Sequence, residues 1–320
     1  MLGALAFLPA VPFGQVVTPV EQMPRLAQAL GCAAGLLVKR DDAIPFAFGG
    51  NKVRKMRLVA ADAVRQGADT LITSGGVQSN HARVTAAAAA KIGLRCVLVV
   101  NGVKPERPSA NALLDALVGA EIRYVATREE RAPTVERIAG EMRRGGGHPY
   151  VIPIGASTPL GAAAYALAVA ELLQQIPAPE VIVHSTSSGG TQAGIIAGCE
   201  LLGAATRVIG VSADEPAGIL EADIRGILAG LPALLHIEPG RFDGVPVEVD
   251  DRFVGGGYGV PTDASIEAMR LTARTEGLFL DPTYTAKAMA GLIARVRDGE
   301  FDKTPTVLFW HTGGQVGLFA

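Results

Sequence analysis

Short apolar runs and helical stretches alternate along almost the whole chain, and this alternation restricts the possible folds more than any other feature. The runs expected to be strands are Leu36–Lys39, Thr70–Thr73, Arg95–Val100, Glu121–Val125, Tyr150–Pro153, Val181–His184, Arg207–Val211 and Thr306–Trp310. The helices expected between them are Ala86–Lys91, Ala110–Leu117, Val135–Arg143, Ala162–Gln175, Ala193–Leu202, Ser265–Thr275 and Ala286–Val296. Such alternation predicts an α/β fold with open, twisted, mostly parallel sheets covered by helices on both faces.

The chain length and the spacing of these elements indicate two domains. A chain of 320 residues is long enough for one large domain or two medium ones. Residues 58–161 contain four strand–helix alternations of their own. We therefore expect a small α/β domain, 58–161, inserted into a large domain made of residues 1–57 and 162–320, each with its own sheet.

Composition excludes several classes of protein. The 49% hydrophobic and 19% charged content is typical of a well-packed globular enzyme or binding protein. A net charge of −2 favours neither nucleic acid nor an anionic membrane as partner. No apolar run reaches the roughly 18 residues that span a bilayer, and Met1–Pro12 lacks the basic start of a signal peptide. The widely spaced Cys32, Cys96 and Cys199 predict reduced thiols, no metal site and a cytoplasmic location.

One lysine lies on the apolar side of a predicted helix. Gly49-Gly50-Asn51-Lys52 is expected to open a helix that runs to about Arg65, with Asn51 as its N-cap. Projection puts Lys52 on the face of Met56, Val59, Ala60 and Ala63, with Arg54, Arg57 and Arg65 on another face and Lys55 near the border. Lys52 could simply extend its amine to water, as most lysines do. A desolvated lysine with a lowered pKa would instead suit imine formation.

Two glycine-containing loops could hold a ligand. Ser74–His81 follows an expected strand and ends at a helix start, where Ser79 and Asn80 could bind a ligand or only cap the helix. His81 alone is most simply a hydrogen-bonded surface histidine. Ser187-Ser188-Gly189-Gly190-Thr191 lies between a strand and a helix N-terminus, which is an anion-binding arrangement. A phosphate monoester fits it best, although Asp214 and Glu215 keep a dinucleotide interpretation open.

These segments together resemble the D-cysteine desulfhydrase/1-aminocyclopropane-1-carboxylate deaminase family of fold-type-II enzymes that depend on pyridoxal 5′-phosphate. The matching segments are Thr18–Glu21, Lys39–Asp42, Gly49–Lys52, Gln78–His81, Gly189–Thr191, Gly257–Thr262, Leu280–Thr285 and His311–Gly314. The resemblance implies a tryptophan synthase β-like architecture, with the cofactor in the cleft between two α/β domains, and a homodimer. A small amino acid would be the substrate.

The resemblance also implies a role for individual residues. Lys52 would bind the cofactor as a Schiff base, the loop from Ser187 to Thr191 would hold the phosphate, and Asn80 would contact the pyridine 3′-oxygen. Ser79, with His81, would face the substrate or take part in proton transfer. The remaining assignments are Tyr258 and Tyr284 beside the reacting carbons and Thr312 at the pyridine nitrogen. Without the resemblance, both tyrosines could be core residues and Thr312 a turn hydroxyl.

The residue after the second tyrosine separates members of this family. Deaminases that open the cyclopropane ring carry Tyr-Glu, desulfhydrases carry Tyr-Thr, and this chain has Tyr284-Thr285. Thr285 is therefore expected near the pyridine nitrogen and the substrate. The chain departs from the family pattern at Val53, at Met56-Arg57 and at Ser187-Ser188, which bears on the substrate but not on the cofactor.

The sequence thus predicts α,β-elimination from D-cysteine to pyruvate, sulfide and ammonia. Alternatives within the family are an L-cysteate sulfo-lyase, a D-serine or chloroalanine lyase, and an aminocyclopropane-carboxylate deaminase. A nicotinamide-dependent oxidoreductase that uses Gly189–Gly194 and Asp214, and a non-catalytic small-molecule sensor, are the alternatives from other classes.

Overall fold

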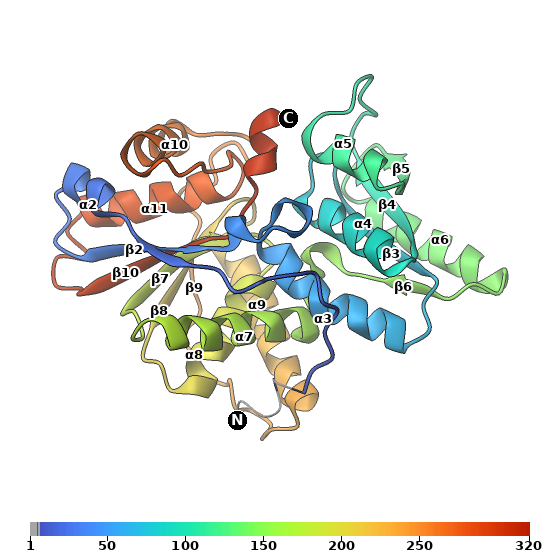
Figure 1. The fold of residues 1–320 in the computed structure, drawn as a ribbon, viewed down its shortest axis with the longest axis horizontal. Coiled ribbons are helices and arrows are strands. Elements are labelled where there is room, and N and C mark those ends of the chain that lie inside the picture. Colours follow the sequence, from blue (N-terminus) through green and yellow to red (C-terminus); the bar gives the residue numbers. More distant parts are fainter. Residues whose placement is uncertain (1–4, 6) are drawn as a thin grey trace.

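The larger of two sheets occupies the centre of one half of the molecule. The computed structural model describes residue 5 and residues 7–320 (Figure 1). The six strands of this sheet follow the order β1-β2-β10-β7-β8-β9. They are β1 (Val20–Gln22), β2 (Gly35–Arg40), β7 (Val181–Thr186), β8 (Arg207–Ser212), β9 (Glu248–Asp250) and β10 (Thr306–His311). Only β1 runs antiparallel to its neighbour, so the expectation of a mostly parallel sheet is confirmed.

Helices cover both faces of this sheet because successive apolar side chains of each strand point to opposite sides. On one face, Ile182 and Leu308 pack with α7 (Pro159–Gln175), α8 (Gly190–Leu202) and α9 (Ala217–Leu235). On the other, Val183 and Phe309 pack with α2 (Pro24–Leu30), α10 (Asp263–Glu276) and α11 (Thr285–Arg297). Figure 1 shows these two groups of helices on opposite sides of the sheet.

The second sheet has four parallel strands in the order β5-β4-β3-β6. They are β3 (Thr70–Gly76), β4 (Arg95–Asn101), β5 (Glu121–Val125) and β6 (Pro149–Val151), accompanied by α4 (Asn80–Ile92), α5 (Ala110–Leu117) and α6 (Arg131–Arg144). The helix α3 (Asn51–Arg65) packs on both α4 and α7 and so joins the two halves (Figure 1). Short 3₁₀ turns complete the description: η1 (Asp41–Ala43), η2 (Phe46–Phe48), η3 (Ile154–Ala156) and η4 (Gln315–Phe319).

Every strand and helix expected from the pattern is present, with ends that differ by up to six residues, the largest difference being at the start of α4. The pattern missed the three-residue strands β1 and β9 and the helices α2 and α9. The helix α9 contains Gly218, Gly226, Gly230 and Pro232, which interrupt a helical pattern in the sequence. Its buried residues, such as Leu228 and Leu231, pack against the core of the large sheet and compensate for these weak helix formers.

The expected N-cap of α3 was wrong. Gly50 occupies that position with φ of 97°, a conformation that favours glycine, and Asn51 is the first helical residue. The Asn51 amide instead donates to the Thr191 hydroxyl at 3.0 Å. The start of α3 is thereby tied to the start of α8, which lies on the other side of the candidate site.

The smaller sheet comes from one continuous stretch of chain, and the larger sheet from the segments on either side of it. We propose that the chain divides into a large domain, 1–57 and 162–320, and a small domain, 58–161. Both boundaries fall inside helices, α3 and α7. Among residues 5 and 7–320, no helix is long and apolar enough to cross a membrane.

Candidate active site

A cavity of about 560 Å³ opens where the carboxyl ends of strands from both sheets meet. Its wall includes residues that directly follow or end β3, β4, β7, β8 and β10. Most of the predicted site residues line it: Lys52, Ser79, Asn80, His81, Ser187, Ser188, Gly189, Thr191, Tyr258, Tyr284 and Thr312. Gly190 and Thr285 do not. Segments up to 260 residues apart in the chain therefore form one site, as the resemblance implied.

Lys52 lies in the first turn of α3, and its side chain forms part of the cavity wall. Its Nζ donates to Asn51 Oδ1 at 3.1 Å. Burial, and then the positive charge of Arg83, lower the pKa of Lys52 to about 8, while Asp281 acts in the opposite direction. Part of this lysine is consequently uncharged near neutral pH, which is the form that attacks an aldehyde.

A second lysine lies beneath the glycine-rich turn, whereas the helix projection placed it only at the border of the apolar face. Lys55 is fully buried, and its Nζ donates to the Gly155 carbonyl at 3.1 Å and lies 3.5 Å from Ser157 Oγ. Burial and the charge of Lys52 hold the pKa of Lys55 well below its usual value. No sequence motif marks Lys55, because its partners come from residues about a hundred positions away.

The turn before α8 presents backbone N–H groups to the cavity. Gly189, at φ of 72°, is the N-cap of α8 and has no side chain of its own to cap that helix. The first N–H groups and the helix dipole therefore favour an anion, with hydroxyls from Ser187, Ser188 and Thr191 beside them. The phosphate site expected from the sequence lies at this turn and stays a prediction.

Gly190 was expected to help hold the phosphate; the space that a Cβ would occupy there is filled by Ser157, which lines the cavity, and by buried Lys55. A Cβ built there would lie 2.7 Å from Ser157 Oγ and 2.8 Å from Lys55 Nζ. The Gly190 N–H donates to Ser157 Oγ at 3.2 Å, and Ser157 in turn lies 2.7 Å from Ser188 Oγ. Ser157 thus supports the turn from below, and no motif in the sequence singled it out.

Ser79 is the N-cap of α4 and Asn80 its first residue, and both line the cavity together with Lys52. The Ser79 hydroxyl accepts the Ala82 N–H at 3.2 Å, so it does cap the helix as well as line the site. The Asn80 side-chain oxygen accepts hydrogen bonds from Arg83 at 2.9 Å and from Asn111 at 3.1 Å. Neither partner was singled out from the sequence.

His81 is not at the surface. Its side chain is buried, and Nε2 lies 2.8 Å from the Thr73 hydroxyl, which itself donates to the Ile152 carbonyl. Because the single Thr73 proton is used on that carbonyl, the hydrogen of the other bond belongs to His81 Nε2. Burial and the nearby Lys52 lower the pKa of His81 well below its usual value, so the imidazole is neutral.

Tyr258 and Tyr284 meet at the cavity with their hydroxyl oxygens 2.5 Å apart. Burial raises the pKa of both phenols, so both are protonated at neutral pH. Arg128 lies over the Tyr258 ring, 5.1 Å from its centroid, and donates to Asp214 at 2.9 Å. Asp214, a candidate in the dinucleotide interpretation, is therefore half of an ion pair at the cavity wall.

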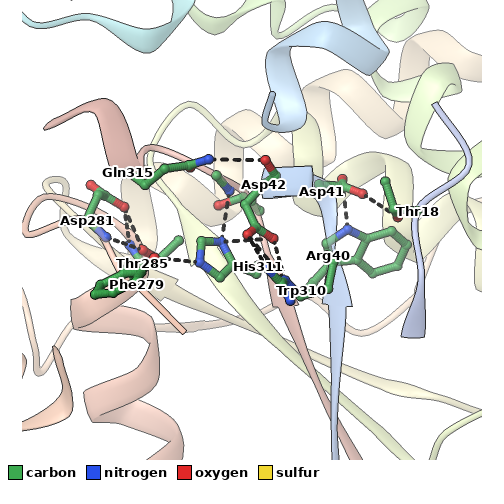
Figure 2. Close-up of polar contacts among 12 residues, drawn as sticks. Thr18, Arg40, Asp41, Asp42, Phe279, Asp281, Thr285, Trp310, His311 and Gln315 are labelled. Carbon is green, nitrogen blue, oxygen red and sulfur yellow. Dashed lines mark hydrogen bonds and ion pairs between the residues drawn. The ribbon is translucent and has the colours of Figure 1, made fainter. Parts of the chain in front are cut away.

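Thr312 lines the cavity, whereas Thr285 lies behind its wall. The Thr312 hydroxyl is 3.0 Å from that of Ser185, which also lines the cavity and was not predicted. Thr285 is fully buried, and its hydroxyl donates to Asp281 Oδ1 at 2.7 Å, as Figure 2 shows. The expectation that Thr285 contacts a substrate is thus corrected to a contact with Asp281, whose carboxylate also accepts the Tyr284 N–H.

These residues fit pyridoxal phosphate. Lys52 supplies an amine of lowered pKa for the aldehyde, and the start of α8 supplies N–H groups for the phosphate. Thr186 Oγ1 lines the same cavity, is buried, and has no hydrogen-bond partner within residues 5 and 7–320, as expected of a group that binds a ligand. No cluster of His, Cys, Asp or Glu that could hold a metal ion occurs in the same described part of the chain.

Comparison with known proteins agrees with this geometry. The family described as pyridoxal-phosphate dependent enzyme matches residues 11–313. The D-cysteine desulfhydrase of Salmonella typhimurium strain LT2 is 38% identical over 324 residues, covering 99% of this chain and 97% of that protein. A crystal structure of an ACC deaminase homologue is 35% identical, with a TM-score of 0.92, and covers 99% of this chain and 95% of its own.

A more distant structure has the same fold. The processed form of threonine deaminase isoform 2 from Solanum lycopersicum is 16% identical, with a TM-score of 0.72, over 98% of this chain and 83% of its own. The fold-type-II architecture expected from the sequence is thereby confirmed. On the match along nearly its whole length, this chain belongs to the family of pyridoxal-phosphate-dependent enzymes.

Proposed function

We propose that this enzyme is a carbon–sulfur lyase that converts D-cysteine and water to pyruvate, sulfide and ammonia. The observation that carries the proposal is the full-length similarity to a D-cysteine desulfhydrase, together with a Lys52 of lowered pKa beside an anion-binding turn. An L-cysteate sulfo-lyase and an aminocyclopropane-carboxylate deaminase are the alternatives, the second because of the similarity to an ACC deaminase homologue.

The proposed binding roles follow from the chemistry of each side chain. Lys52 would hold the cofactor covalently, while Ser187, Ser188, Gly189 and Thr191 would hold its phosphate. Asn80 would donate to the 3′-oxygen. The hydroxyls of Thr312 and Ser185, 3.0 Å apart, would meet the pyridine nitrogen.

Bound pyridoxal phosphate supplies an electron sink for the pair left on Cα when its proton is removed. A hydroxyl pair such as Thr312 and Ser185 cannot keep the pyridine nitrogen protonated as a carboxylate would. The weaker sink favours substrates whose β-substituent leaves readily, such as sulfide. β-Elimination is therefore favoured over opening of a cyclopropane ring.

Two groups are proposed to move protons. Lys52, once free of the cofactor, would accept the Cα proton, because its lowered pKa leaves it partly uncharged. Tyr258 and Tyr284 share a hydrogen bond and are protonated at neutral pH, so this pair can donate a proton to the departing sulfur. Ser79 would contact the substrate carboxylate from the start of α4. His81 was expected to join it, but its Nε2–H is used on Thr73, and the Nδ1 that remains can only accept a hydrogen bond, so it cannot donate to that carboxylate.

Absorption spectroscopy and product assays test the proposal. The purified enzyme should show the visible band of lysine-bound pyridoxal phosphate, and borohydride reduction should leave the pyridoxyl group on Lys52. Lys52→Ala should lose both the band and turnover while keeping the parent's circular dichroism. A pyridoxyl group on another lysine would disprove the assignment.

A substrate panel separates the activities. We expect pyruvate from D-cysteine and β-chloro-D-alanine, and little product from aminocyclopropane carboxylate or L-cysteate. Equal rates of ring opening and sulfide release would refute the D-cysteine assignment while leaving the cofactor assignment intact. We further propose that the enzyme is a homodimer, which light scattering would measure. We also propose a cytoplasmic location, because the three cysteines are all free in the structure, as in a reducing compartment.

A further inference from the structure

The side chain of Asn80 is held by two hydrogen-bond donors on the side away from the cavity. Arg83, one turn along α4, donates to Asn80 Oδ1 at 2.9 Å, and Asn111 Nδ2 on α5 donates to the same oxygen at 3.1 Å. Both donors are buried: Arg83 is 2% exposed and Asn111 is 0% exposed. The contacts therefore belong to a packed interior and not to a mobile surface.

The orientation of the Asn80 and Asn111 amides follows from neighbouring groups that can only donate or only accept a hydrogen bond. A guanidinium only donates, so the atom of Asn80 that faces Arg83 must be its oxygen. The same Arg83 nitrogen donates to Asn111 Oδ1 at 2.8 Å, and Asn111 Nδ2 donates to the Gln78 carbonyl, which can only accept, also at 2.8 Å. Neither amide can be turned over without placing a donor against a donor.

With its oxygen engaged twice, Asn80 has only its N–H₂ group left for the cavity that it lines. An amide in the opposite orientation would present a lone pair instead. The difference matters for a ligand oxygen that carries negative charge, because a donor stabilises that charge and an acceptor repels it.

We infer that Asn111 and Arg83 are positioning residues that keep Asn80 a donor toward the 3′-oxygen of bound pyridoxal phosphate. This inference rests on the proposed function, in which Asn80 contacts that oxygen. Arg83 also donates to the Gly49 carbonyl at 3.0 Å, three residues before Lys52. We call the hydrogen bonds of Arg83 and Asn111 to Asn80 the clamp. Through Arg83, the clamp links the start of α4 to the turn that leads to Lys52.

The pKa at which the visible band of the bound cofactor titrates reports this contact directly. A donor to the 3′-oxygen draws its charge away from the proton shared with the Lys52 nitrogen and lowers that pKa. Loss of a hydrogen bond to a charged group should raise it by about one pH unit. Asn111→Leu is the informative variant, since it removes the amide without changing any charge, whereas Arg83 variants would also remove a charge near Lys52.

The experiment is a double-mutant cycle on the holoenzyme, with the parent, Asn111→Leu, Asn80→Ala and the double variant titrated spectroscopically. We expect Asn80→Ala and Asn111→Leu each to raise the pKa, and Asn111→Leu to add nothing in the Asn80→Ala background. If Asn111→Leu does not fold, Asn111→Ala removes the same hydrogen bonds and keeps a good helix former. Ala112→Gly, which weakens α5 without touching the amides, is the stability control and should leave the titration unchanged.

Three results would overturn the inference. An unchanged titration in Asn111→Leu, beside a shifted one in Asn80→Ala, would leave the proposed cofactor contact standing and reject the clamp. If Asn111→Leu raised the pKa equally in the parent and in the Asn80→Ala variant, Asn111 would act on the cofactor independently of Asn80. If Asn80→Ala itself has no effect, the proposed contact with the 3′-oxygen is wrong, and the clamp fails with it.

Discussion

Substitution of Gly190 by alanine tests how tightly the turn before α8 is supported from below. The added Cβ would lie 2.7 Å from Ser157 Oγ and 2.8 Å from Lys55 Nζ, whereas ordinary contacts begin at 3.4 Å. Ser157 and Lys55 must therefore retreat by about 0.6–0.7 Å, which lengthens the hydrogen bonds of Ser157 to the Gly190 N–H and to Ser188. Two weakened hydrogen bonds at ~1 kcal/mol each and an overpacked contact of ~1–3 kcal/mol predict a loss of about 3–5 kcal/mol.

Two measurements separate the effect of this substitution on stability from its effect on cofactor affinity. Gly190→Ala should lower the free energy of unfolding of the apoenzyme in urea by that amount and should weaken pyridoxal phosphate binding at least tenfold in an absorbance titration. Gly226→Ala is the matched control, because Gly226 is exposed inside α9 and a Cβ there meets nothing. That variant should be neutral or more stable by about 0.5–1 kcal/mol. Equal behaviour of the two variants would refute the close-packing argument.

Three further substitutions have defined outcomes. Arg128→Gln removes the ion pair with Asp214 and should raise KM for the amino acid by about fivefold in initial-rate assays, with little change in unfolding, as expected for a half-exposed pair worth ~1 kcal/mol. Burial raises the pKa of Asp115 to about 7, so the folded state holds the proton more tightly than the unfolded state does. The free energy of unfolding should therefore fall as pH rises from about 4 to 7. Asp115→Asn should remove this decline when urea unfolding is compared at pH 5 and pH 8. Thr285→Glu brings a second carboxylate against buried Asp281 and should lower Tm in calorimetry, whereas Thr285→Ser, which keeps the hydroxyl, should stay close to the parent.

The elements of the fold could be predicted because the signals for them are local. The strand Arg95–Asn101 contains a continuous apolar run, Cys96–Val100, since both of its faces are buried, and the intervening helices carry their own period. The weak elements were missed where local preference and tertiary packing disagree. Helix α9, which contains Pro232, forms because residues such as Leu228 and Leu231 are buried against the large sheet.

The site was predictable in part for the same reason. Lys52, Asn80 and the turn at Gly189 stand in short segments whose order resembles a known family, and the structure brings them to one cavity. The sequence could not indicate that Gly190 has no room for a Cβ, because the atoms that exclude a Cβ there belong to Ser157 and Lys55.

Tertiary contacts alone decided which polar groups support the site. The helix projection set Arg54 apart from the apolar face, yet it is buried in ion pairs with Asp41 and Glu171, both brought to it from other elements. Asn111 likewise has an ordinary position in its helix, and only the packing of α5 against α4 places it on the Asn80 oxygen, beside Arg83 from the next turn of α4. Amphipathic periodicity reports how a segment meets the core as a whole. The partner of a buried charge or amide depends on which distant segment packs against it, and that is determined only when the chain has folded.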